Sequence, residues 1–311
     1  MQYFTDTEKS IDLKEVNRAI ETAFADHGRG VVQMPPKIYV TLPEGDFRTM
    51  PAYLPSLGLA GVKVVNVHPG NPARGLLTVM ALTIILDIAT GTPMAILNAT
   101  KLTDMRTGAA GAVAAKHLSA KKEIVLGLVG TGRQAEAQYR AISQELDIRE
   151  IKCWSRNSLH AEKFAGAIMG YDSRSVPLEK ACDCDVLVTT TPSREPVVMS
   201  EWVQEGTHIN AIGADAPGKQ ELDPLLLKRG IVFVDDMSQA VHSGEINVPV
   251  SRGLFNPEEI EGTLGEVVLG MKRRESPDQI TIFDSTGLAI QDLAIAAIAM
   301  RNGRATDLPF P

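Results

Sequence analysis

The sequence predicts an α/β protein of two domains: a doubly wound domain built on a parallel sheet, and a mixed α+β domain. From Glu123 onward, short β-branched runs alternate with longer helical segments, which is typical of βαβ units. The first 118 residues do not show this alternation. The chain has 311 residues, 44% of them hydrophobic, and is therefore long enough to build two separate cores.

The doubly wound domain is expected to span residues 119–287. Its strands are predicted where β-branched residues cluster, at 124–129, 151–154, 186–190, 208–212, 231–234 and 280–283. Helices at 134–145 and 158–167 separate the first three strands and have the length of ordinary crossover connections. These connections predict that the strands pair in parallel.

The other domain is expected to combine residues 1–118 with residues 288–311. It should contain a helix at 13–26 and extended segments at 37–42, 62–67 and 76–87, several of which pair into a mixed sheet. Residues 103–118 are rich in Ala and Gly, which predicts a helix packed closely against a neighbour and bridging the two domains. An apolar, Ala-rich helix at 288–300 is expected to return to the first domain.

Charge and hydropathy exclude two classes of partner. The formal net charge is -7 and the Lys and Arg residues are scattered, so the basic stripe typical of nucleic-acid-binding proteins is absent from the sequence. The start of the chain lacks the pattern of a signal peptide, and no apolar run reaches the ~18 residues of a membrane span. We therefore expect a cytoplasmic protein with neither nucleic acid nor a membrane as its partner.

The three cysteines, Cys153, Cys182 and Cys184, are sparse and odd in number, which suits reduced thiols rather than a disulfide framework. Cys182 and Cys184 form a C-x-C pair. No second pair or nearby His follows that would complete a zinc site. We expect these cysteines to pack beside a strand and expect no bound metal.

A glycine-rich fingerprint follows the first predicted strand. The pattern G-x-G-x-x-A is formed by Gly130, Gly132 and Ala135 at the junction of a strand and a helix. Gly130 permits a tight turn, Gly132 lets a pyrophosphate approach the backbone, and Ala135 lets the helix pack closely on the strand. The free N–H groups of the helix N-terminus would meet the phosphates. The pattern therefore predicts a Rossmann domain that binds a nicotinamide dinucleotide.

The end of the second strand predicts which dinucleotide is bound. An acidic side chain at this place would take the ribose hydroxyls of NAD, but the sequence has Ser155 and Arg156 and no carboxylate. Both side chains suit a 2'-phosphate, the Arg through a bidentate contact. NADP(H) is therefore favoured. NAD(H) remains the alternative, with Arg156 stacked on the adenine or turned to solvent.

Two cations of the first domain are candidates for binding an anionic substrate. Lys63 lies in a run of aliphatic residues, so it should be partly desolvated, which lowers its pKa and suits a carboxylate ligand or acid–base chemistry. The alternative is a lysine snorkelling from an edge strand. Arg106 stands near the start of a predicted helix, where the dipole disfavours a cation unless it faces an anion. That anion would be a substrate carboxylate or an acid such as Asp104.

Three further charged residues occupy positions with two possible readings. Arg48 follows Asp46 in a segment interpreted as a loop, and alone it would be an ordinary loop residue. Asp215 follows a predicted strand, where open α/β sheets bind their ligands, so it could face the nicotinamide and the reacting amine. Its alternative role is to cap a turn. Asp284, after the last strand, presents the same ambiguity.

Five motifs, in register along nearly the whole chain, resemble the ornithine cyclodeaminase and mu-crystallin family. They are Gly61-Val-Lys63-Val-Val-Asn66, Leu102-Thr-Asp-Met-Arg106-Thr107-Gly-Ala-Ala, the Gly130 loop, Gly213-Ala-Asp215-Ala-Pro-Gly-Lys219 and Asp284-Ser-Thr-Gly287. The resemblance implies a homodimer whose first domain, completed by the C-terminal helix, supplies dimer contacts and substrate groups across a cleft from the Rossmann domain. It also implies hydride transfer between the nicotinamide and an amino acid or an imine.

The resemblance also implies roles for individual residues. Lys63 and Arg106 would hold the substrate carboxylate, and Asp215 would face the amine or the attacking water, so that Lys63 and Asp215 are the predicted catalytic residues. Thr286 would lie near the substrate. The residues implied along the cofactor, besides the glycine loop, are Thr78, Thr107, Arg133, Gln134, Gly213, Lys219 and Ser285.

Two departures from the cyclodeaminase pattern bear on the substrate. Arg48 stands where cyclodeaminases have a Glu and where the archaeal-type alanine dehydrogenases have an Arg; it would repel a second ammonium group, which argues against ornithine. Lys37 stands where cyclodeaminases carry an Arg for the carboxylate, and the exchange loses a bidentate fork.

We therefore interpret the sequence as that of an alanine dehydrogenase-like enzyme, which interconverts a small 2-amino acid with its 2-oxo acid and ammonia. The alternatives are a reductase of cyclic imines such as pyrroline or piperideine carboxylate, which the preference for NADP(H) would favour, and an ornithine cyclodeaminase. A non-catalytic protein that binds NADPH and a small ligand, like mu-crystallin, is the alternative from another class. The presence of Lys63, Arg106 and Asp215 together favours catalysis.

Overall fold

The computed structural model describes residues 1–5, 8 and 11–310. The chain forms two compact units: unit 1 combines Met1–Arg106 with Leu288–Pro311, and unit 2 is Thr107–Gly287. The first boundary falls inside helix α2 (Thr100–Leu118), not after residue 118 as expected from the sequence. A continuous helix carries the chain from one unit to the other, so the sequence shows no loop signal at this boundary.

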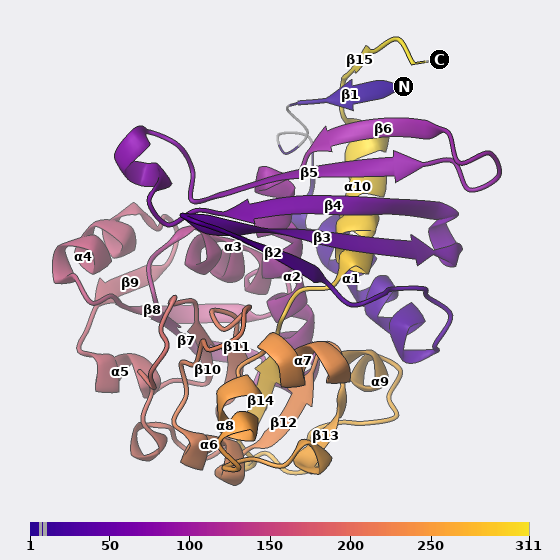
Figure 1. Ribbon diagram of the computed structural model, residues 1–311. Helices are drawn as coiled ribbons and strands as arrows, with labels where there is room; N and C mark the ends of the chain where they lie inside the picture. The colour runs from indigo at the N-terminus through magenta and orange to yellow at the C-terminus, as the bar shows by residue number, and fades with distance from the viewer. Residues whose placement is uncertain (6–7, 9–10, 311) are drawn as a thin grey trace. The chain divides into compact units, whose positions relative to one another are not determined.

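Unit 2 is built on a parallel sheet. Within the described residues its strand order is β13 (Ile260–Thr263), β12 (Ile231–Val234), β14 (Thr281–Asp284), β11 (His208–Ala211), β10 (Val186–Thr189), β7 (Glu123–Val129), β8 (Asp147–Trp154) and β9 (Asp172–Ser175). All neighbouring pairs run parallel, and the strand order reverses between β7 and β10 (Figure 1). The predicted doubly wound sheet is confirmed, and its ligand crevice is expected at this reversal.

Helices α3 (Arg133–Ile142) and α4 (Ser158–Ala167) confirm the two predicted crossovers. Several short elements of unit 2 were not predicted: β9, β13, α5 (Leu178–Cys182), α6 (Pro224–Arg229), α7 (Met237–Ser243), α8 (Asn247–Ser251), α9 (Leu264–Val268), η4 (Ser200–Trp202) and η5 (Pro257–Glu259). Segments this short contain too few residues to display a helical or strand period.

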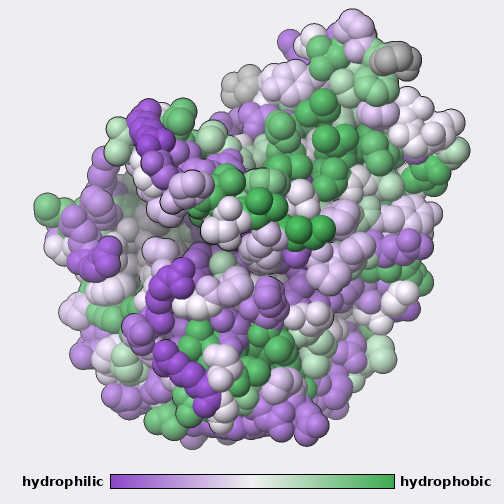
Figure 2. All heavy atoms as spheres, in the orientation of Figure 1, coloured by the Kyte–Doolittle hydropathy of each residue, from purple (hydrophilic) through white to green (hydrophobic). Residues whose placement is uncertain are grey.

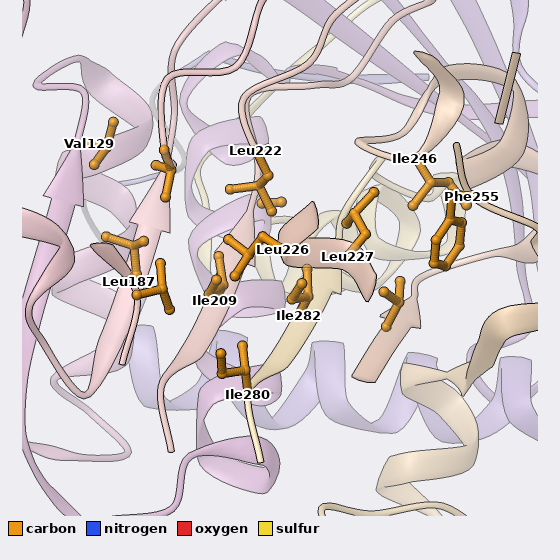
Figure 3. Close-up of a cluster of buried hydrophobic side chains, with 14 of the residues drawn as sticks. Val129, Leu187, Ile209, Leu222, Leu226, Leu227, Ile246, Phe255, Ile280 and Ile282 are labelled. Carbon is orange, nitrogen blue, oxygen red and sulfur yellow. The ribbon is translucent and has the colours of Figure 1, made fainter. Parts of the chain in front are cut away.

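An aliphatic core fixes the strands of unit 2 against the helices on one face of the sheet. Ile209 and Ile282 project from adjacent strands toward Leu226 and Leu227 of α6, with Phe255 at the edge of the cluster (Figure 3). All five side chains are at most 4% exposed. Burying a side chain of this size contributes about 1.5–3 kcal/mol. The cluster therefore holds the strands rigidly and gives the loops at their carboxyl ends fixed starting points.

Unit 1 contains a mixed sheet. Among the described residues the order is β15 (Ala305–Asp307), β1 (Gln2–Phe4), β6 (Pro93–Asn98), β5 (Val79–Leu86), β4 (Leu59–Val67), β3 (Gly45–Leu54) and β2 (Ile38–Leu42), with the 3-10 turns η2 (Pro55–Leu57) and η3 (Asn71–Arg74) between strands. β1 pairs parallel with β6, whereas the other pairs are antiparallel. The predicted mixed sheet is confirmed.

The interpretation of residues 45–51 as a loop is wrong, because they form most of strand β3. Buried and partly buried positions alternate along this strand, and Arg48 occupies a buried position beside Met50. A charged residue at an inward position hides the apolar–polar alternation from which a strand is predicted. Arg48 is accommodated there because Asp46, on the same strand, accepts a hydrogen bond from it.

Helices cover one face of this sheet. α10 (Ala289–Asn302) packs on β3, β4 and β5 and against α1 (Leu13–Gly28) (Figure 1). The register places Val64 opposite Leu82, and Val62 opposite Ile84, on the other face. Leu82 is 46% exposed, and apolar side chains gather over these strands in the space-filling view (Figure 2). Unit 1 thus presents one helix-covered face and one bare apolar face.

The Ala- and Gly-rich part of α2 packs tightly within unit 2, as predicted. A Cβ added at Gly108 would lie 2.4 Å from the backbone oxygen of Ala137 in α3, and one at Gly111 would lie 2.0 Å from Oε1 of Gln138. Any side chain at these positions would push the helices apart. α3, which follows the glycine fingerprint, is therefore anchored directly on α2.

None of the described helices is long and apolar enough to cross a membrane.

The three cysteines are free; Cys153 and Cys182 are buried, and burial raises the pKa of each thiol to about 12. Both thiols are therefore protonated at neutral pH and unreactive.

Candidate active site

The glycine fingerprint forms a tight turn between β7 and α3. Gly130 has φ +111, a conformation that L side chains rarely adopt, and a Cβ there would lie 2.5 Å from Oγ1 of Thr190. Ala135 is fully buried on the inner side of α3. The backbone turn and the close packing of α3 require small residues at Gly130 and Ala135, whether or not a cofactor is bound.

Gly132 is different, because the protein itself does not require a glycine there. Its backbone is extended, and a Cβ added to it would meet nothing within 4 Å. Gly132 is the N-cap of α3, and no side chain caps this helix end. The N-terminus of α3 thus lies beside a residue with no side chain, where an anion would meet the positive end of the helix dipole. Both features fit a dinucleotide pyrophosphate.

The end of β8 presents the residues predicted for the adenosine end of the cofactor. Ser155 is partly buried and Arg156 exposed, directly after the last residue of the strand. Asn157 is occupied as the N-cap of α4, where its side chain accepts a hydrogen bond from the Leu159 N–H. Arg156 therefore remains the charged group at this strand end.

A cavity of about 170 Å³ lies beside the carboxyl ends of β10 and β11. It is lined by Gln134, Thr190, Thr191, Pro192, Ile212, Gly213, Asp215 and Lys219. The structure thus brings together four residues that sequence motifs had singled out: Gln134, Gly213, Asp215 and Lys219. Lys219 Nζ lies 2.6 Å from Oδ1 of Asp215, so the two charges form an ion pair at the cavity wall.

The loops around this cavity are held by a buried carboxylate that the sequence did not indicate. Glu221 is fully buried and accepts hydrogen bonds from the Thr189 hydroxyl, the Thr191 N–H and the Gly213 N–H. Glu245, also buried, accepts hydrogen bonds from the backbone N–H of Glu221. Burial raises the pKa of both carboxyls. Glu221 therefore ties the loop after β10 to the loop after β11.

The DSTG motif, which begins with the last residue of β14, is fixed in a similar way. Asp284 accepts hydrogen bonds from the backbone N–H groups of Glu245 and Ile246, which gives it a structural role. The Thr286 hydroxyl donates to Asp235, and the Ser285 N–H donates to the Ala211 carbonyl. Ser285 and Thr286 are at most 5% exposed. Hydrogen bonds thus fix the motif to the neighbouring segments at the carboxyl end of the sheet.

Lys63 lies on β4, in the interior of the unit 1 sheet, so it is not a lysine snorkelling from an edge strand. It is 1% exposed, and its Nζ lies 2.9 and 2.8 Å from the two carboxylate oxygens of Asp292 on α10. Burial, helped by the nearby charges of Arg106 and Lys37, lowers its pKa to about 7, against the opposing effect of Asp292. The predicted desolvation of Lys63 is confirmed.

Arg106 joins the same cluster. Its Nε donates to Oδ1 of Asp292 at 3.1 Å, and its Nη1 donates to Oε1 of Gln291 at 2.9 Å. The acid beside Arg106 is therefore Asp292, and not the sequence neighbour Asp104. Gln291 Nε2 is buried with no hydrogen-bond partner among the described residues. The cluster holds two cations, one carboxylate and a spare amide donor, which suits a second carboxylate.

Arg48 faces the same side of the sheet as Lys63, because Met50 pairs with Lys63 and Arg48 with Val65 in the register. Its Nε lies 2.8 Å from Asp46, and its guanidinium lies over the Tyr39 ring, 5.1 Å from the centroid. Asp46 and Tyr39 thus hold the Arg48 side chain on the sheet face that also carries Lys63.

Thr78 and Thr107 belong to different units and have backbone roles. The Thr78 carbonyl accepts from the His68 N–H in unit 1. The Thr107 carbonyl accepts from the side chain of Gln138 in unit 2. The predicted residues thus gather into two sets, with Lys63, Arg106 and Arg48 in unit 1 and the dinucleotide loop with Asp215 and Lys219 in unit 2.

Asp292 and Gln291 were missed in the sequence, although a signal for them exists. They are polar residues in a predicted helix that is otherwise apolar, and such a helix is buried on most sides. A carboxylate in a buried helix requires a cationic partner. The signal indicates that a partner exists, but it does not indicate which cation.

Comparisons with known proteins show the family of the chain. The model of the ornithine cyclodeaminase/mu-crystallin family matches residues 1–306. The chain belongs to this family. The alanine dehydrogenase of Archaeoglobus fulgidus is 51% identical over 300 residues, which cover 96% of this chain and 92% of the relative.

Two solved structures that resemble this chain extend the comparison. An archaeal alanine dehydrogenase dimer with bound NAD superposes with a TM-score of 0.95 at 48% identity, covering 99% of both chains. The Δ1-pyrroline-2-carboxylate reductase of Thermococcus litoralis, in complex with NADH and L-proline, has a TM-score of 0.95 at 34% identity, covering 99% of this chain and 100% of that one. The chain described in Figure 1 is therefore an oxidoreductase with a nicotinamide-binding Rossmann fold.

Proposed function

We propose that the protein is an alanine dehydrogenase, which reversibly converts L-alanine to pyruvate and ammonia. The observation that carries the proposal is the buried cluster of Lys63, Arg106 and Asp292, whose two cations face a single carboxylate. A substrate carboxylate would balance the remaining charge. The 51% identity to an archaeal alanine dehydrogenase supports this choice of substrate.

In this mechanism the cation cluster of unit 1 binds and orients the substrate. Lys63 and Arg106 would hold the carboxylate of alanine. A dinucleotide held by unit 2 would supply the hydride acceptor for the oxidation of the amine to an imine. Lys63, with a pKa of about 7, exchanges its proton readily at neutral pH. We assign substrate binding to unit 1 and dinucleotide binding to unit 2.

Hydrolysis of the imine completes the reaction. Lys63 or Asp215 directs a water molecule onto the imine carbon, the carbon–nitrogen bond then breaks, and pyruvate and ammonia leave. Asp215 suits this role because its carboxylate is 36% exposed and is held by Lys219 at the wall of the cavity. In the reverse direction the same groups return the proton as water departs.

The surroundings of the cluster argue for a small substrate side chain. Arg48 is buried on the same sheet face as Lys63, and Lys37 adds another positive charge close to it. A second ammonium group, as in ornithine, would meet these cations and be repelled. A methyl side chain carries no such cost.

The direct test follows nicotinamide absorbance with purified protein. NADH and NADPH are each offered with pyruvate plus ammonia and, separately, with pyrroline-2-carboxylate. We expect oxidation with pyruvate and ammonia. Turnover of the cyclic imine alone would establish the second candidate, a ketimine reductase, which the likeness to the Thermococcus reductase favours. Binding of the dinucleotide with no turnover of any imine would indicate a non-catalytic binding protein.

For the cofactor we propose NADP(H) as the preferred form and NAD(H) as a usable alternative. If Arg156 holds a 2'-phosphate, Arg156→Ala should weaken NADPH binding about 10-fold and change NADH binding much less. Arg149→Ala, which removes an exposed arginine nearer the start of the same strand, is the control. Equal losses for both cofactors, or none, would contradict the preference. Fluorescence titration of each reduced cofactor measures the two affinities.

We further propose that the protein is a homodimer and that the bare apolar face of the unit 1 sheet forms the interface. Contiguous apolar surface of this kind marks association sites. Leu82→Glu should therefore convert the dimer to monomers, because it places a charge in the centre of that face. Leu159→Glu, at a 69% exposed leucine on α4, should leave the dimer intact. Sedimentation velocity distinguishes these outcomes, and an unchanged Leu82→Glu dimer would exclude this face.

A further inference from the structure

Asp292 links the two cations on which the proposed function depends. We propose that Asp292 is a positioning residue: it holds the Lys63 ammonium and the Arg106 guanidinium side by side, so that the three groups present one net positive charge to the substrate carboxylate. This inference rests on the proposed function. It adds to that function a residue of α10 that orders the two cations of the carboxylate site.

The geometry of the cluster shows how one carboxylate serves both cations. Oδ1 of Asp292 lies 2.9 Å from Lys63 Nζ and 3.1 Å from Arg106 Nε, and Oδ2 lies 2.8 Å from Lys63 Nζ. The side chains of Lys63 and Asp292 are 1% and 4% exposed, and that of Arg106 is 7% exposed. Solvent therefore screens these charges little, and the cations would repel each other strongly without the carboxylate.

The charges that face Lys63 come from several elements. Arg106 on α2 and Lys37 before β2 both disfavour its proton, whereas Asp292 on α10 favours it. Arg48, on the same face of β3, is paired with Asp46. Asp292 is thus the carboxylate that offsets burial and the neighbouring cations at the Lys63 ammonium.

The start of α10 is built to hold this carboxylate in place. Asp292 lies in the first helical turn, where the helix dipole stabilises a negative charge. The preceding Gln291 accepts from the Leu288 N–H and from Arg106, which fixes the turn and the guanidinium together. The buried Nε2 of Gln291 has no hydrogen-bond partner among the described residues and could donate to a bound carboxylate.

The test measures the titration of Lys63 directly. In protein labelled with ¹³Cε-lysine, the Lys63 signal, assigned by its loss in Lys63→Met, should titrate near pH 7. In Asp292→Asn the midpoint should fall by about one unit or more, because the group that favours the proton is neutralised. In Asp292→Glu it should stay close to that of the native protein. The proposal would be overturned if the Lys63 midpoint did not move in Asp292→Asn. It would also be overturned if Asp292→Glu lowered that midpoint as much as Asp292→Asn does.

Steady-state kinetics give a second readout. The kcat/KM for pyruvate should fall above pH ~7, where Lys63 loses its proton, and in Asp292→Asn this falling limb should move to lower pH. Gln291→Met, which removes the contacts of Gln291 to Arg106 and to the Leu288 N–H but leaves Asp292 in place, should raise KM without moving the limb. A shifted lysine signal without any turnover of pyruvate would preserve the positioning role and refute the proposed function. Turnover of pyruvate with an unmoved Lys63 signal in Asp292→Asn would support the proposed function and refute the positioning role.

Discussion

Replacing Gly132 with Asp should abolish dinucleotide binding and leave the fold intact. A Cβ at this position meets no protein atom within 4 Å, and the backbone is in an ordinary extended conformation. The new carboxylate would occupy the space before the uncapped N-terminus of α3 and would repel a pyrophosphate there. We expect the Kd for NADH and NADPH to rise at least ~100-fold. Fluorescence titration of the reduced cofactors measures this loss.

Gly166→Asp is the matched control for this substitution. Gly166 lies on α4, and a Cβ added to it also meets nothing within 4 Å. Both variants should keep the Tm of the native protein to within a few degrees, and only Gly132→Asp should lose the cofactor. Gly130→Ala is expected to be different, because its Cβ would collide with Thr190 and the protein should lose stability. Retained cofactor binding in Gly132→Asp would show that the pyrophosphate lies elsewhere.

Lys63→Met should nearly eliminate catalysis without unfolding the protein. Met has a similar length, and Asp292 would keep Arg106 as its partner, so no charge is left buried alone. The substrate carboxylate would lose one of its two cations, and the reaction would lose an acid–base group. We expect kcat/KM for pyruvate with ammonia to fall by ~10³-fold or more. The residual activity should no longer show an inflection near pH 7.

Lys228→Met provides the comparison for Lys63→Met. Lys228 forms an exposed ion pair with Glu259 and does not line the cavity beside Asp215, so its loss should change the rate by less than about 2-fold. If Lys63→Met retained more than a tenth of the native rate, Lys63 would not be a catalytic residue of this protein. A retained inflection near pH 7 would assign that titration to another group.

The sequence by itself determined the local structure of the cofactor loop and its context. Gly130, Gly132 and Ala135 follow a strand and begin a helix, and each requirement concerns residues close together in the chain. Strand and helix periodicity likewise predicted most of the doubly wound sheet, because its longer segments are buried in a regular pattern. The desolvation of Lys63 could be predicted for the same reason, since its neighbours on both sides are aliphatic.

Only the tertiary structure decided which groups meet at the site. The partner of Lys63 lies 229 positions away in the chain, on α10, and the partner of Arg106 is that same Asp292 rather than the adjacent Asp104. A buried charge requires a partner of opposite charge, but that partner can come from anywhere in the chain and depends on how the helices pack. Glu221, which ties the two loops beside Asp215, was invisible for this reason.

Strand order and the inward place of Arg48 were also decided by tertiary packing. β14 comes last in the chain among the strands of unit 2 but lies between β11 and β12, because strands of similar apolar character can exchange places in a sheet without changing their local pattern. Strand β3 was not predicted because Arg48 places a charge at an inward position. Asp46 and Tyr39 accommodate that charge inside the fold. Local sequence determines backbone conformation, whereas the pairing of distant buried groups depends on the packing of the complete chain.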